Sequence, residues 1–250
     1  MQLEYKPVVL KLKDPEEVAH FVVTQIMALI NRKANAVMTI PTGKTPERMY
    51  RMLVEAVQEG KLDLNKATIR MLDEYQWLEQ NDPRTFQNQL RRLLINPIHF
   101  PNTQFQTINS YPEKKTDPFE EADRYEALIS ATPADMAILG IGQNGHVGFN
   151  EPPARFTDRT RVVQLSDSTL EANKKDINRH GKYTPKFAIT QGLGNILEAN
   201  RIVLMATGKS KADIIRQTLK GEINTMVPSS ALRTRQNVLF VLDSAAASLL

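Results

Sequence analysis

The chain has 250 residues and no cysteine, which excludes disulfides, thiol nucleophiles and thiolate metal sites. It also has no run of about 18 consecutive apolar residues, the length that a membrane-spanning helix needs. Its first residues lack an uninterrupted apolar stretch of signal-peptide length. We therefore expect a cytoplasmic protein without a membrane partner, whose chemistry uses oxygen and nitrogen groups.

A nucleic-acid partner is disfavoured by two further absences. There is no run of five or more basic residues, and there is no set of aromatic residues interleaved with basic ones. The net charge of +4 suits a phosphorylated metabolite, although many ordinary proteins carry a similar excess. We expect a small-molecule ligand and no nucleic acid.

No Gly/Ser-rich or Pro-rich linker and no internal repeat divides the chain, so we interpret residues 1–250 as one domain. A helix is expected to begin at Pro15 with Asp14 as its cap. Five runs have the length and apolar character of buried strands: residues 34–41, 67–73, 134–142, 201–207 and 237–243. Helical patterns separate several of them, at about residues 84–95, 117–131 and 209–220. This alternation predicts an α/β fold with a mostly parallel sheet and helices on both faces.

Two loops that follow expected strands, "PTGKTP" and "ATGKSK", contain a Gly-Lys-Thr or Gly-Lys-Ser tripeptide. A nucleotide-binding P-loop needs another glycine five residues earlier, where this chain has Met38 and Val203. Each loop does open an expected helix, and helix N-termini bind phosphate. We predict that Gly43, Thr45 and Lys211 contact a phosphate; the alternative is that these residues only start helices.

In "LDEYQWL", Asp73 and Glu74 follow an expected strand. Consecutive side chains of an extended chain point to opposite sides, so only one of the two faces a cleft. A carboxylate there could abstract a proton, bind a sugar hydroxyl or hold a metal. The alternative is an acidic residue that serves the N-terminus of the next helix.

The segment "ILGIGQNGHVGFNEPP" has the Gly-x-Gly-x-x-Gly spacing of a dinucleotide-binding loop. That motif should lead directly into a helix, whereas here two prolines follow shortly and stop one. The glycines instead suit a tight loop that presents Asn144, His146 and Glu151 to a cleft. An amide or carboxylate beside an imidazole sets its tautomer and its basicity. A lone histidine is more often structural, but the neighbouring Asn and Glu favour a catalytic one.

Taken together, "PTGKTP", "LDEYQWL", "LGIGQNGHVGFNEP" and "TGKSK", in this order and spacing, resemble the glucosamine-6-phosphate deaminase (isomerase) family over essentially the whole chain. The resemblance implies a Rossmann-like α/β fold. It also implies conversion of an amino-sugar 6-phosphate and water to a ketose 6-phosphate and ammonia, with no nucleotide or metal cofactor.

The resemblance also implies roles for individual residues. Asp73 matches the base that moves a proton between C2 and C1, and His146 matches the group that opens the pyranose ring, oriented by Asn144 and Glu151. The phosphate-binding positions are matched by Thr42, Gly43, Thr45 and Lys211. Two further lysines are expected near the phosphate: Lys44, where small residues are usual, and Lys175, where an arginine is common. Trp77 stands where the family often has glycine.

Several alternatives stay open. Galactosamine 6-phosphate, which would give tagatose 6-phosphate, differs from glucosamine 6-phosphate only at C4. A sugar-lactone hydrolase of the related branch is disfavoured by "FNEP", and a non-catalytic sugar-phosphate sensor by the joint presence of Asp73, His146 and Glu151. The sequence leaves open a homo-oligomer and a lid over residues 155–185. Because it stops at Leu250, short of the extension of allosterically activated family members, we do not expect activation by an N-acetyl sugar phosphate.

Overall fold

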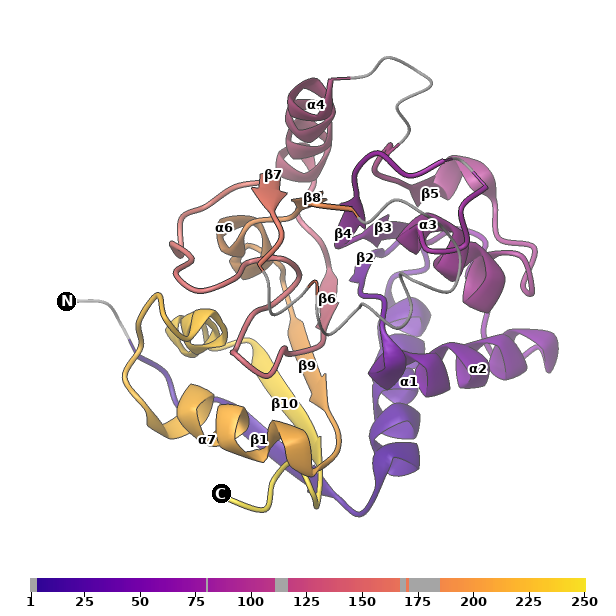
Figure 1. Cartoon of the computed structure of the whole chain (residues 1–250). Coiled ribbons are helices and arrows are strands. Elements are labelled where there is room, and N and C mark those ends of the chain that lie inside the picture. The colour runs from indigo at the N-terminus through magenta and orange to yellow at the C-terminus, as the bar shows by residue number, and fades with distance from the viewer. Residues whose placement is uncertain (1–3, 80, 111–116, 167–169, 171–184) are drawn as a thin grey trace.

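The computed structural model describes residues 4–79, 81–110, 117–166, 170 and 185–250. Its main feature is a seven-stranded sheet in the order β1-β10-β9-β6-β2-β3-β5, in which all neighbouring strands run parallel (Figure 1). The strands are β1 (Val8–Leu12), β2 (Val37–Ile40), β3 (Thr68–Met71), β5 (Phe105–Gln106), β6 (Met136–Leu139), β9 (Ile202–Ala206) and β10 (Val238–Asp243). The predicted parallel sheet is confirmed.

Apart from a short helix at Leu193–Leu197, which was not predicted, the helices fall where the sequence patterns place them. They are α1 (Pro15–Arg32), α2 (Lys44–Gln58), α3 (Phe86–Leu90), which continues as a π-helix (Arg91–Ile95), α4 (Pro118–Ala131), α6 (Leu193–Leu197) and α7 (Ala212–Lys220). Short 3₁₀ turns cover Asn102–Gln104, Lys209–Lys211 and Pro228–Thr234. The predicted start of α1 is confirmed, because the Asp14 carboxylate accepts the N–H groups of Glu16 and Glu17, each at 3.0 Å.

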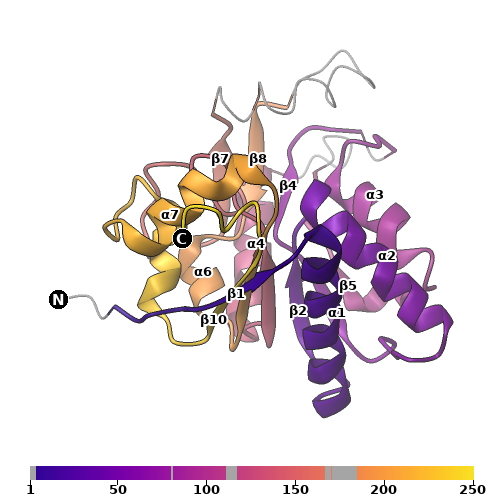
Figure 2. The same cartoon turned by 90° about the horizontal axis from the view of Figure 1, so that it is seen from below.

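The large sheet is covered on both faces, with α1 and α2 on one side and α6 and α7 on the other (Figure 2). Strand β9 shows how the sequence serves both layers. Its Val203 and Met205 belong to the apolar cluster that contains α1 and α2, whereas the alternate residues Ile202, Leu204 and Ala206 belong to the cluster that contains α6 and α7. A strand buried on both faces is apolar at every position, which explains the continuous runs in the sequence.

A second sheet was not predicted. It has three antiparallel strands in the order β4-β8-β7, namely β4 (Asp73–Tyr75), β8 (Phe187–Thr190) and β7 (Arg161–Gln164) (Figure 1). The expected strand over residues 67–73 was therefore too long: β3 ends at Met71, and Asp73 already pairs with Thr190 in the other sheet. The error arose because the strand-like run continues through Met71 and Leu72 to Asp73, and nothing local marks the change of partner.

The order of the strands locates the site. The chain passes from β2 to β3, which pairs with one side of β2. The other side of β2 pairs with β6, and the next strand of the sheet beyond β6 is β9. In open α/β sheets, ligands bind beyond the carboxyl ends of the strands at such a reversal of order. The loops after β2, β6 and β9 therefore lie side by side.

Candidate active site

The loop after β6 brings three polar side chains into contact. His146 Nδ1 lies 2.7 Å from Asn144 Oδ1 and 3.2 Å from Glu151 Oε1. The Asn144 amide also donates to Glu151 Oε2 at 2.6 Å. The imidazole keeps 27% of its side-chain surface exposed, against 13% for Glu151. The predicted cluster of Asn144, His146 and Glu151 is thus assembled, with the ring at the surface and the carboxylate behind it.

These contacts define the tautomer of His146. An amide oxygen and a carboxylate only accept hydrogen bonds, so Nδ1 carries the proton and Nε2 of the neutral ring is the basic nitrogen. The ring rests against Gly142, where an added Cβ would lie only 2.2–2.5 Å from three ring atoms. Gly142 thus leaves space for the imidazole of His146.

Asp73 lies at the start of β4, is 7% exposed, and accepts no hydrogen bond through its carboxylate within the described part of the chain. Burial raises the pKa of Asp73 to about 7. Its Oδ2 lies 3.4 Å from the point where a Cβ at Gly148 would stand. The carboxylate and the loop that carries His146 are therefore neighbours, as predicted.

Glu74, the next residue, points the other way and is fully buried. Its carboxylate accepts the backbone N–H groups of Tyr75 at 2.8 Å, Phe86 at 2.9 Å and Gln87 at 2.8 Å. The last two belong to the first turn of α3. Burial raises the pKa of Glu74 to about 8, although these three donors oppose the shift. Both interpretations of the acidic pair therefore apply, one to each residue: Asp73 is the unbonded carboxylate, and Glu74 serves the next helix.

The two glycine-containing loops are alike in geometry. Gly43 caps α2 with φ of 117°, and Gly208 precedes the 3₁₀ turn before α7 with φ of 89°. A Cβ at either glycine would find nothing within 4 Å, so both loops face open space. Thr42 and Thr45 are half-buried, and Lys44 is exposed. The first turn of α2 leaves backbone N–H groups without intrahelical acceptors, whereas the Gly208 N–H in the second loop already donates to both carboxylate oxygens of Asp243 at 3.0 Å.

Lys211 reaches from the second glycine loop toward the loop after β6, which carries His146. Its Nζ donates to the backbone carbonyl of Ile141 at 2.6 Å, and burial lowers the pKa of its ammonium group. The cation therefore lies at the carboxyl edge of the sheet, between β9 and β6. Lys175 lies outside the described residues.

The family model for glucosamine-6-phosphate isomerases/6-phosphogluconolactonase matches residues 14–241 of the chain. The chain belongs to this family. It is 42% identical over 236 residues to a glucosamine-6-phosphate deaminase of Rhodopirellula baltica, covering 93% of this chain and 90% of the relative. It is 38% identical over 240 residues to the enzyme of that name from Shewanella loihica, covering 95% and 87%.

Solved structures agree with this membership. A monomeric glucosamine-6-phosphate deaminase superposes with a TM-score of 0.91 at 35% identity, covering 97% of this chain and all of the other. A 6-phosphogluconolactonase from Trypanosoma brucei has a TM-score of 0.79 at 18% identity and shares the fold alone. The Rossmann-like α/β class is confirmed. None of the helices in the described ranges is long and apolar enough to cross a membrane.

Three residues of the site were not predicted from the sequence. Asn150 is fully buried and donates to the carbonyls of Val147 at 2.9 Å and Gln191 at 2.8 Å. Thr190 and Gln191, at the end of β8, contact both the segment of Leu72 and Asp73 and the loop after β6. Asn150 was visible in "FNEP", but no local signal marks Thr190 or Gln191, because their partners are far away in the sequence.

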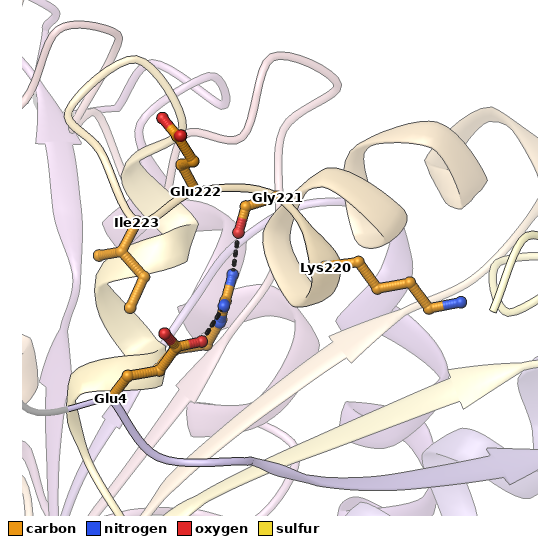
Figure 3. A pocket seen from close by; sticks show the side chains of 6 residues that line it. Glu4, Lys220, Gly221, Glu222 and Ile223 are labelled. Carbon is orange, nitrogen blue, oxygen red and sulfur yellow. Dashed lines mark hydrogen bonds and ion pairs between the residues drawn. The ribbon is translucent and has the colours of Figure 1, made fainter.

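Two open hollows lie away from this site. One, of about 480 Å³, is lined by Glu4, Lys220, Gly221, Glu222, Ile223 and Arg233 (Figure 3). It lies at the C-terminal end of α7, roughly 13 Å along the helix from Lys211, and the Arg233 guanidinium is already bonded to Glu4 and to the Gly221 carbonyl. The other, of about 510 Å³, lies at the amino end of the sheet, beside Arg32, Lys33 and Asp135. Neither contains a predicted site residue.

Proposed function

We propose that this family member converts glucosamine 6-phosphate and water to fructose 6-phosphate and ammonia. The observation that carries the proposal is the contact between the His146 imidazole, the Asn144 amide and the Glu151 carboxylate, beside the unbonded Asp73. The names of relatives that are 38–42% identical over more than nine-tenths of the chain support the same reaction.

The 6-phosphate is assigned to the loops at Gly43 and Gly208. A phosphate dianion there would accept the N–H groups at the start of α2 and the hydroxyl groups of Thr42 and Thr45. Lys211 would supply a positive charge, with Lys44 nearby. Because the phosphate is remote from C1 and C2, its binding energy serves to hold the reacting carbons in place.

Ring opening is assigned to His146. A closed hemiacetal must lose the proton on O1 and gain one on O5 to become the open-chain aldehyde. Nε2 of the neutral ring can take the first proton and return one to O5. Asn144 and Glu151 hold Nδ1–H and stabilise the charge that develops on the ring.

Proton transfer and loss of ammonia follow on the open chain. Asp73 accepts the proton from C2, the electron pair of that bond forms the C1=C2 double bond, and O1 gains a proton. Asp73 then delivers its proton to C1, and the nitrogen lone pair forms a C2=N bond. Water adds to C2, and the nitrogen leaves as ammonia, which gives the ketose. A carboxylate with a pKa near 7 is well matched to this task.

The decisive test is ammonia release from glucosamine 6-phosphate and galactosamine 6-phosphate, measured side by side as kcat/KM, with non-phosphorylated glucosamine as the control. We expect turnover of the first sugar, and much weaker turnover without the phosphate. Preference for galactosamine 6-phosphate would reassign the substrate at C4 and keep the mechanism. Absence of ammonia from both 6-phosphates, with binding retained, would indicate a sensor.

A further inference from the structure

The groups assigned to chemistry lie on two separate elements. Asp73 belongs to β4, whereas Asn144, His146 and Glu151 belong to the loop after β6. No hydrogen bond joins the Asp73 carboxylate to that loop within the described part of the chain. Something else must therefore determine how far the proton-abstracting group stands from the ring-opening group.

The end of β8 contacts both elements. Thr190 is paired with Asp73 across the antiparallel sheet, and Gln191 N–H donates to the Leu72 carbonyl at 2.9 Å. On the other side, the Thr190 hydroxyl oxygen accepts the N–H of Phe149 at 3.1 Å. The Gln191 carbonyl accepts the Asn150 side chain at 2.8 Å. Thr190 and Gln191 thus connect the strand of Asp73 to the loop after β6 through hydrogen bonds.

The fit around Thr190 is close. Gly148, between His146 and Phe149, has φ of 59°, and a Cβ there would lie 2.8 Å from the Thr190 hydroxyl oxygen and 3.4 Å from Asp73 Oδ2. Thr190 itself is fully buried. The loop backbone therefore passes the Thr190 hydroxyl group at a distance that leaves no room for a Cβ, and it lies next to the Asp73 carboxylate.

We propose that Thr190 is a positioning residue, whose hydroxyl group determines the separation between Asp73 and the cluster of His146, Asn144 and Glu151. This role rests on the proposed function, in which both groups act on one substrate, at C2 and at O1 and O5. Misplacement of a reacting group by about 1 Å can cost about 100-fold in rate. Thr190 touches no reacting atom in this proposal and acts through the loop.

The test compares Thr190→Val with Thr190→Ser. Valine keeps the branched shape but leaves the buried Phe149 N–H without its acceptor, whereas serine keeps the acceptor. We expect kcat of T190V to fall by about 10- to 100-fold with KM within about threefold, and T190S to stay within about threefold of the unmodified chain. Thr160→Val is the matched control, because Thr160 is a buried threonine whose hydroxyl bonds Asn195, outside the site.

Hydrogen exchange provides a second measurement that does not depend on activity. Faster exchange over residues 144–151 is expected in T190V and not in T190S or T160V. Equal kinetic losses in T190V and T190S, a similar loss in T160V, or unchanged exchange in T190V would each overturn the proposal. If the unmodified chain releases no ammonia, the proposed function fails by itself, and unchanged exchange over 144–151 in T190V then also shows that Thr190 does not hold the loop.

Discussion

The two sheets contribute different groups to the candidate site. The large parallel sheet supplies loops at its carboxyl edge, where Gly43 and Gly208 face open space and Lys211 Nζ lies against the Ile141 carbonyl. The small antiparallel sheet supplies Asp73, a buried residue whose carboxylate accepts no hydrogen bond from the described residues, and Thr190, which contacts the loop after β6. Helix starts suit binding, whereas a strand that alternates its side chains can present one carboxylate to the cleft and bury the next. In the proposed function, the base for C2 therefore comes from the small sheet, whereas the phosphate loops and the loop of the ring-opening His146 come from the large sheet.

Changing Asp73 should break this comparison most strongly. We expect Asp73→Asn to lower kcat by about 10²–10⁴-fold with little change in KM, because the amide keeps the shape and cannot accept the proton. Steady-state kinetics measures the effect, and Asp123→Asn, an exposed position on α4, is the control. Retention of more than about a tenth of kcat would contradict the assignment of Asp73 as the base.

The raised pKa of Asp73 predicts that both kcat/KM and the effect of Asp73→Asn on stability depend on pH. In the unmodified chain, kcat/KM should fall as pH drops below about 7, because the base becomes protonated. A carboxyl group whose native pKa is raised contributes stability that is complete below its unfolded pKa and is lost as pH rises through the native pKa. Asp73→Asn should therefore raise the melting temperature more at pH 8 than at pH 5. An equal rise in melting temperature at pH 5 and pH 8 would show that burial does not raise the pKa of Asp73.

Changing Lys211, at the edge of the large sheet, should affect binding. We expect Lys211→Ala to reduce kcat/KM by about 10- to 150-fold, mainly through KM, since a charge-assisted contact contributes about 1.5–3 kcal/mol. Lys209→Ala, an exposed lysine in the same turn, is the matched control and should change little. Unchanged kinetics in a folded Lys211→Ala protein would remove Lys211 from the phosphate site.

Changing Glu74 should have the smallest effect on catalysis, since it tests the buried side of β4. In Glu74→Gln, one acceptor oxygen remains for three backbone N–H groups, and the side-chain NH₂ group faces N–H donors that it cannot accept. We therefore expect the free energy of unfolding to fall by about 1–3 kcal/mol. The folded variant should keep kcat within about a factor of ten, which corresponds to a loss of transition-state stabilisation of at most about 1.4 kcal/mol. Denaturant unfolding measures the loss, with the exposed Glu16→Gln as control. A large fall in kcat without a change in stability would place Glu74 in the chemistry.

Local sequence determined most strands of the large sheet and one half of the candidate site. The two-faced apolar runs predicted β2, β6, β9 and β10, and Asp14 marked the start of α1. The contacts among Asn144, His146 and Glu151 join residues at most seven positions apart, so their spacing within one loop was enough to predict them. Periodicity and short-range hydrogen bonding are visible along the chain.

Only the tertiary structure decided the other half. Asp73 and Glu74 are neighbouring carboxylates that the sequence alone does not distinguish. Their surroundings differ because the chain leaves the large sheet after β3 and β4 pairs with β8, more than a hundred residues later. The contact of Lys211 with Ile141 likewise spans 70 residues. Such pairings depend on which distant segments pack together to bury apolar surface and satisfy backbone hydrogen bonds, and no pattern within a single segment records that choice.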